Sequence, residues 1–247
     1  MPSTLTKVLN QQLGTSISQA RTIRIVPKNH MFGHCFRSMS YDSTVWATLE
    51  RWSPIAFLVA GGLFILPTAI YGFGVATGTG NVVSPAVIFV LMLVVFVGLL
   101  GLYPRLAGEG STLALGGVGL LSATAAVIIS TLAIVALPTG LTLGKPHILA
   151  IVTTVVVGST LTLGTFGVAS LRSGIHSRSV GSSLLVMAAG DFSILVAMQV
   201  YGDPTPAWVG FVVGGLFVVS LASIGYVLRT ETISAENSES PGDVAAS

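Results

Sequence analysis

Residues Val180–Tyr201, with the sequence VGSSLLVMAAGDFSILVAMQVY, decide the fold because they are long and apolar enough to cross a lipid bilayer. A helix needs about 20 predominantly apolar residues to span the hydrocarbon core. This stretch also carries Asp191 near its middle, and no other span that we predict holds an ionisable side chain at such depth. Because a carboxyl group inside a membrane is costly, Asp191 is either functional or held by polar neighbours.

The composition of the whole chain indicates a membrane protein. Of its 247 residues, 52% are hydrophobic and 8% are charged, whereas soluble domains have about 25% charged residues. So few charges cannot cover a soluble surface, and most of the surface must therefore contact lipid. We expect no cleavable signal peptide at the start of the chain, because the first 50 residues lack a long apolar run.

Six apolar segments predict six membrane-spanning helices. Lipid offers no partner for unpaired backbone groups, which favours helices, and a continuous apolar run such as Val87–Leu102 does not alternate as the strands of a membrane barrel do. We therefore predict an all-α bundle of six transmembrane helices over residues 53–229, between a polar, basic, disordered tail at 1–52 and an acidic, disordered tail at 230–247. The six segments are Ser53–Val75, Ser84–Tyr103, Thr112–Leu137, His147–Leu171, Val180–Tyr201 and Pro206–Leu228.

The positive charges predict the orientation of the helices. If the N-terminus is cytoplasmic, the cytoplasmic segments together hold ten Lys and Arg residues, and the outer loops hold only Lys145. Cytoplasmic loops of membrane proteins carry such an excess of basic residues. We therefore expect a multi-pass protein of the plasma membrane, with both the N- and the C-terminus in the cytoplasm.

The start of the chain differs in charge from the rest. The first 41 residues contain five basic and no acidic side chains, whereas the chain from Met39 onward has six Lys and Arg against nine Asp and Glu, a net charge of −3. We interpret residues 1–38 either as a segment that is absent from the working protein, which would begin near Met39, or as a basic tail that binds anionic lipid headgroups. The His and Cys cluster at His30–Cys35 lacks a second ligand pair, so we predict no metal site.

Polar and small residues define a candidate site around Asp191. On a helix, Ser183 and Gln199 lie two turns to either side of Asp191 on the same face. A charge at this depth would cost about 2.5–3.5 kcal/mol, and no Lys, Arg or His lies at matching depth, so we expect the carboxyl to be mostly protonated. The residues that we expect to pack or bond across the neighbouring helix interfaces are Thr154, Gly158, Thr162 and Thr165 in the fourth segment and Gly210 and Gly214 in the last.

The segment LGLYPRL ends one apolar helix in Leu-Tyr-Pro-Arg, and FGVASLRSGIHSRSV ends a later one in Leu-Arg-Ser-Gly followed by another Arg. In this pattern the chain resembles a group of uncharacterised six-span integral membrane proteins of haloarchaea and high-GC bacteria, over roughly Ser53–Arg229. The group has no known activity, so the resemblance implies six spans and no particular chemistry. The matching positions are Leu102, Tyr103, Arg105, Leu171, Arg172, Ser173, Gly174 and Arg178.

The sequence leaves two functions open. No span interior holds a histidine or a second carboxyl group, and no phosphate-binding loop is present, which argues against an intramembrane enzyme and predicts no cofactor and no nucleic-acid partner. The first function is a non-enzymatic accessory or interaction protein, which contacts lipid and a membrane-protein partner or a second copy, and in which Asp191 packs helices. The second is a small transporter or channel that uses Asp191 for coupling to a proton or cation. A polar cavity beside Asp191 would favour the second, and a dry helix contact the first.

Overall fold

The structure is a computed structural model, in which the chain divides into two compact units, Met1–Tyr41 and Asp42–Ser247. All described residues belong to the second unit, so the predictions that concern residues 1–42, including the cluster at His30–Cys35, lie outside them. The described residues are 43–79, 83–107, 112–136, 144–202 and 205–239.

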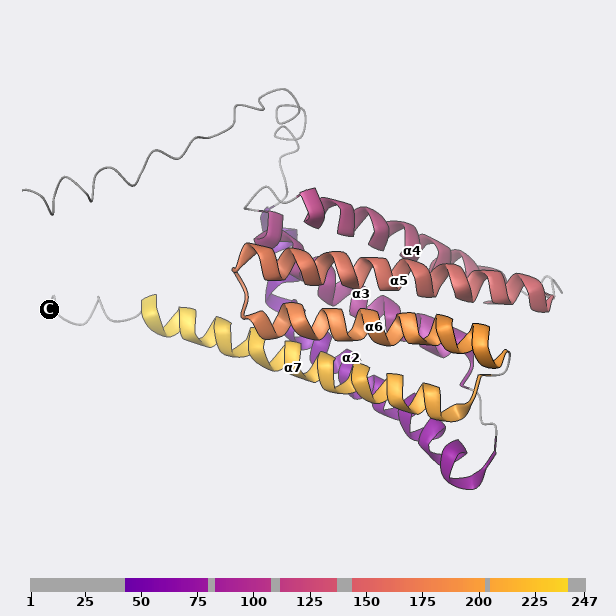
Figure 1. Cartoon of the computed structure of the whole chain (residues 1–247). Coiled ribbons are helices and arrows are strands. Elements are labelled where there is room, and N and C mark those ends of the chain that lie inside the picture. Colours follow the sequence, from indigo (N-terminus) through magenta and orange to yellow (C-terminus); the bar gives the residue numbers. More distant parts are fainter. Residues whose placement is uncertain (1–42, 80–82, 108–111, 137–143, 203–204, 240–247) are drawn as a thin grey trace, which may run out of the picture. The chain divides into compact units, whose positions relative to one another are not determined.

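Six α-helices form this second unit, and its described residues include no strand (Figure 1). Each helix is long and apolar enough to cross a membrane, with candidate spans of 23 to 33 residues. This confirms the predicted all-α fold with six spans. The helices are α2 (Ser43–Thr77), α3 (Pro85–Ala107), α4 (Thr112–Ala136), α5 (Lys145–Ser173), α6 (Arg178–Tyr201) and α7 (Ala207–Glu239).

The helices pack against one another in a closed ring (Figure 1). Each of α2 to α6 contacts the helix that follows it in the chain, and α7 returns to α2 in the most extensive of these interfaces. A smaller contact between α3 and α5 crosses the ring. One end of the bundle, which we call the arginine end, holds Arg51, Arg105, Arg172, Arg178 and Arg229. The opposite end holds Thr77, Pro85, Pro146, Tyr201 and Ala207.

Small residues close the ring between α2 and α7. A Cβ atom added at Gly210 would lie 2.8 Å from the ring of Tyr71, and Gly214 packs against Thr68. Gly225 lies equally close to α2, since an added Cβ would be 3.0 Å from a backbone oxygen of that helix. The GxxxG pair predicted to pack helices is therefore used inside this chain, where it lets two backbones approach.

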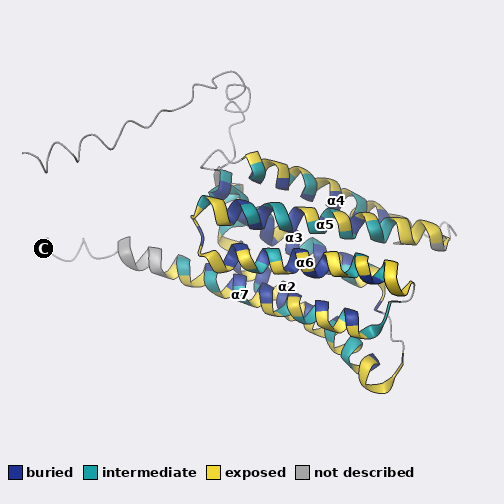
Figure 2. Cartoon of the chain, in the orientation of Figure 1, coloured by how far each residue is buried: buried dark blue, intermediate teal, exposed yellow. Residues whose placement is uncertain are grey.

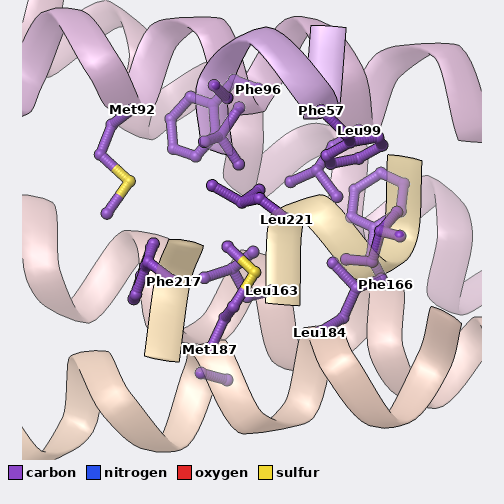
Figure 3. Close-up of a cluster of buried hydrophobic side chains, with 14 of the residues drawn as sticks. Phe57, Met92, Phe96, Leu99, Leu163, Phe166, Leu184, Met187, Phe217 and Leu221 are labelled. Atoms are coloured by element: carbon purple, nitrogen blue, oxygen red, sulfur yellow. The ribbon is translucent and has the colours of Figure 1, made fainter. Parts of the chain in front are cut away.

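Aromatic and aliphatic side chains fill the ring and also cover its outside. Phe57, Phe96, Phe166 and Phe217 are among the largest fully buried side chains, and they lie with Leu and Met residues between the helices (Figure 3). The exposed positions alternate with the buried ones around each helix (Figure 2). Many of them are large and apolar, such as Val219, which is 69% exposed. A surface of this kind is stable in lipid and not in water.

Two helices extend beyond the predicted span boundaries, which corrects the limits of both tails. α2 begins at Ser43, inside the predicted basic tail, and its Trp46 packs on Tyr103 of α3 with ring centroids 5.6 Å apart. α7 continues to Glu239, past the predicted start of the acidic tail at Thr230. Neither extension contains Gly or Pro, so nothing in the backbone ends the helix there.

Candidate functional site

Asp191 lies in the middle of α6 and bonds to α5. Its side chain is 1% exposed, and Ser159 Oγ donates a hydrogen bond to Asp191 Oδ2 at 2.5 Å. Ser159 is also 1% exposed, so the contact is closed to solvent on this side. Within the described part of the chain, no cationic side chain is paired with Asp191. The carboxyl is therefore held by a neutral hydroxyl, without an opposite charge.

The Ser159 hydroxyl has one proton and two acceptors within reach. Its Oγ lies 2.5 Å from Asp191 Oδ2 and 3.1 Å from the carbonyl oxygen of Val156. When Asp191 is ionised, Ser159 can donate to the carboxylate. When Asp191 is protonated, the carboxyl can donate to Ser159 Oγ, and Ser159 can donate to Val156. Both protonation states of Asp191 thus keep a hydrogen bond without any movement of the helices.

The threonine stripe predicted beside Asp191 lies toward α4 instead. Gly158, which belongs to the same stripe, packs against Thr124 of α4. Ser159 is one residue further along α5, and a helix turns by about 100° per residue, so its hydroxyl points to α6. Sequence reasoning missed Ser159, although a hydroxyl on the neighbouring face of α5 was a signal that could have found it. The stripe's hydroxyls donate to backbone carbonyls of their own helix, at 2.7 to 2.9 Å, from Thr154, Thr162 and Thr165.

The two polar residues predicted to bracket Asp191 do not reach it. Ser183 is half-buried and Gln199 is exposed. Among the described residues, the hydrogen bond of Asp191 comes from Ser159 and from neither of these. Each lies eight residues from Asp191, about 12 Å along the helix axis, which is too far for a hydrogen bond to its carboxyl.

A cavity of about 100 Å³ borders Asp191 on the side of α2 and α7. Aromatic side chains form much of its wall, and Phe64 and Phe217 lie with their ring centroids 5.3 Å apart. Thr68 and Tyr71 add hydroxyl groups to the wall, and the Thr68 hydroxyl already donates to the Phe64 carbonyl at 2.7 Å. Asp191 thus lies between a closed hydrogen bond to α5 and an open space toward the other helices.

Two larger cavities lie between this space and the opposite end of the bundle. Tyr71, Ile88 and Ile194 also line a second cavity of about 340 Å³, which α2, α3, α5 and α6 enclose. A third cavity of about 390 Å³ adjoins the second one at Phe89 and Ile148, between α3, α4 and α5. Asp191 therefore borders the first of three neighbouring cavities, and the second and third lie nearer the end of the bundle that holds Tyr201.

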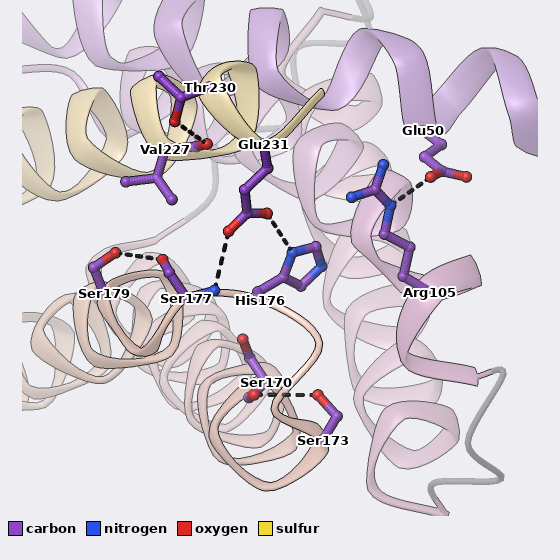
Figure 4. Close-up of polar contacts among 10 residues, drawn as sticks. All are labelled: Glu50, Arg105, Ser170, Ser173, His176, Ser177, Ser179, Val227, Thr230 and Glu231. Atoms are coloured by element: carbon purple, nitrogen blue, oxygen red, sulfur yellow. Dashed lines mark hydrogen bonds and ion pairs between the residues drawn. The ribbon is translucent and has the colours of Figure 1, made fainter. Parts of the chain in front are cut away.

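Polar contacts close the arginine end (Figure 4). Arg105 Nε donates to Glu50 Oε1 at 2.5 Å, which joins α3 to α2. In the turn between α5 and α6, His176 Nδ1 lies 3.1 Å from Glu231 Oε2, and the Ser177 backbone N–H donates to Glu231 Oε1 at 3.0 Å. These contacts tie that turn to α7. The arginine end is thus held by the ion pair between α2 and α3 and by the hydrogen bonds of Glu231 to the α5–α6 turn.

Little space remains between these two sets of contacts. A gap of about 10 Å³ lies where Glu50, Arg105 and His176 come together, and a space of that size holds about one water molecule. His176 is 4% exposed, and its Nε2 has no hydrogen-bond partner among the described residues. The volume of this gap is much smaller than the volumes of the cavities on the other side of Asp191.

No group of three or more His, Cys, Asp or Glu side chains that could hold a metal ion occurs within the described ranges. Comparison with models of protein families, with curated proteins and with solved structures finds no match to this chain. The features that bear on function are therefore Asp191, the cavity beside it and the closed arginine end.

Proposed function

We propose that this chain is a small membrane transporter in which Asp191 carries a proton or a cation. One observation supports this most strongly: a buried carboxyl without a paired cation borders a cavity that shares wall residues with a larger one toward one end of the bundle, while polar contacts close the other end. Transporters bind their ions near the middle of the membrane and expose the site to one side at a time. Intramembrane carboxyl groups are the usual carriers of protons in such proteins.

The charges support an orientation in which the cavity faces outward. The five described arginines lie at the arginine end, and Lys145 begins α5 at the opposite end. Because cytoplasmic segments carry the excess of Lys and Arg, we place the arginine end in the cytoplasm of a plasma-membrane protein, together with both termini. In this orientation the cavities beside Asp191 lie toward the outside, and the contacts of Glu50, Arg105, His176 and Glu231 form an inner gate.

One observation favours the alternative function, that of an accessory or interaction protein. The bond between Ser159 and Asp191 is a dry contact between α5 and α6, and such a bond stabilises helix packing without any transported ion. In that case Asp191 would be structural, and a partner or second copy would cover part of the lipid-facing surface. Gly210 and Gly214 do not serve such a partner, because they pack against α2.

Proton flux into vesicles separates the two functions. The purified protein is placed in liposomes that contain a pH-sensitive dye, and the outside is acidified while valinomycin and potassium hold the membrane potential. We expect faster acidification than in empty liposomes, loss of this flux in Asp191→Asn, and its retention in Ser193→Ala. Ser193 is a suitable control because it is exposed on α6 and its hydroxyl donates to its own helix, to the Gly190 carbonyl at 2.6 Å.

The folding of each variant is checked by its thermal midpoint in detergent. Asp191→Asn should fold, because asparagine has the shape of a protonated aspartate and can still accept from Ser159. A folded Asp191→Asn protein with the same proton flux as the original chain would contradict the transporter proposal. A folded variant that loses flux supports it, and so does restored flux in Asp191→Glu.

A further inference from the structure

We propose that Asp191 and the apolar walls of the two neighbouring cavities, of about 100 and 340 Å³, bind an organic cation with an apolar body, in exchange for the proton of Asp191. This inference rests on the proposed transport function and names its substrate class. Two features of the site lead to it: the chemistry of the cavity wall, and the lack of oxygen ligands for an inorganic ion.

The wall suits an apolar body that carries a positive charge. Phe64, Tyr71 and Phe217 line the cavity around Asp191, and Ile88 and Ile194 continue the apolar wall toward the second cavity. Aromatic faces attract ammonium groups, and quaternary ammonium ligands are recognised in this way. Asp191 supplies the full negative charge, and no described cationic side chain neutralises it.

The same wall is poor for an inorganic cation. Calcium takes about 6–8 oxygen ligands, and magnesium demands about six in octahedral geometry. The cavity offers the Asp191 carboxyl and the hydroxyls of Thr68 and Tyr71, and the Thr68 hydroxyl is already bonded to Phe64. An ion that sheds its water shell here would lack replacements. A methylated ammonium group spreads its charge over its methyl groups and needs no set of ligands.

The Asp191 carboxyl can bind a proton or pair with a cation, but not both, because protonation removes its negative charge. In the proton-loaded state, Asp191 donates to Ser159, and Ser159 donates to Val156. When the organic cation enters, the carboxyl proton leaves to water, Ser159 turns its own proton to Asp191 Oδ2, and the carboxylate pairs with the cation. The net charge of the site is unchanged, because one cation replaces one proton. Ser159 is thus a positioning residue for the exchange.

Cation binding by the purified protein tests the exchange directly. The probe is benzyltrimethylammonium, whose charge is permanent, so any proton released comes from the protein. Isothermal titration calorimetry in two buffers of different ionisation enthalpy counts the protons released for each cation bound. We expect up to one proton, with the apparent affinity rising by up to about tenfold for each pH unit while Asp191 is protonated.

Two controls isolate the charge and the carboxyl. Neopentylbenzene has the shape of the probe with carbon in place of nitrogen, and it should release no proton. Asp191→Asn should release none either and should bind the cation at least about tenfold more weakly, whereas Ser193→Ala should match the original chain.

Cation binding without proton release, equal binding by Asp191→Asn, or an equal response to neopentylbenzene would overturn the inference. If benzyltrimethylammonium does not bind but proton flux through Asp191 persists in liposomes, this inference fails and the proposed function stands. If the cation exchanges with a proton in solution but no proton flux occurs, even into liposomes loaded with benzyltrimethylammonium, the proposed function fails and the binding site stands.

Discussion

The hydrogen bond between Ser159 and Asp191 gives a quantitative prediction. Its oxygen atoms lie 2.5 Å apart, and both side chains are 1% exposed. Ser159→Ala removes the hydroxyl and leaves the carboxyl without this partner. Hydrogen bonds between membrane helices contribute about 0.6 kcal/mol on average and about 1.7 kcal/mol at most in double-mutant cycles. Because this bond is short and dry, we expect a coupling free energy of about 1 kcal/mol.

The coupling is measured with four proteins: the original chain, Ser159→Ala, Asp191→Ala and the double variant. Their free energies of unfolding come from titration with SDS in mixed micelles, followed by circular dichroism. The cycle is needed because removing a buried carboxyl changes the insertion cost as well as the bond. A second cycle that pairs Asp191→Ala with Ser193→Ala is the control and should give a coupling near zero, because the Ser193 hydroxyl bonds to its own helix.

A coupling free energy near zero for Ser159 and Asp191 would refute this reasoning, because two buried side chains joined by a hydrogen bond cannot contribute independently to stability. Equal couplings in the two cycles would do the same, since the effect would then not depend on contact between α5 and α6.

Two further substitutions test the packing and the closed end. Gly158→Ala should lower the thermal midpoint in detergent because the new Cβ would overlap Thr124, whereas Gly164→Ala, whose Cβ would meet nothing within 4 Å, should not lower it. Equal midpoints would show that α4 does not pack on α5 at this point. Glu231→Ala removes an acceptor for the Ser177 backbone N–H, so amide hydrogen exchange in the α5–α6 turn should become faster. Unchanged exchange there would mean that Glu231 does not hold the arginine end.

The six helices long enough to span a membrane and the buried position of Asp191 could be predicted from sequence because both depend on local properties. Span length follows from the run of apolar residues, and the cost of a carboxyl follows from its depth in one helix. The small residues Gly210 and Gly214 were also recognisable as packing positions. The helix against which they pack could not be predicted, because α7 packs against α2, the helix furthest from it in the chain.

The contacts that define the site depend on how the ring closes. Ser159 and the neighbouring Gly158 differ by one residue, yet one faces α6 and the other faces α4. Arg105 lies 55 residues from Glu50 along the chain, and no local pattern links them. Sequence patterns of period 3.6 identify a face of a helix, and only the arrangement of all six helices decides what that face meets.

The central claim is that Asp191 is reached from the outside and closed from the inside. In a Cys35→Ser background, which removes the only cysteine, Ile194→Cys places a thiol in the wall that the two cavities share. Ser179→Cys, exposed at the arginine end, is the matched control. An impermeant trimethylammonium methanethiosulfonate reagent should label Ile194→Cys in intact cells, and benzyltrimethylammonium should slow this labelling. It should label Ser179→Cys only in inverted vesicles. Labelling of Ile194→Cys only in inverted vesicles, or in neither preparation, would contradict the account.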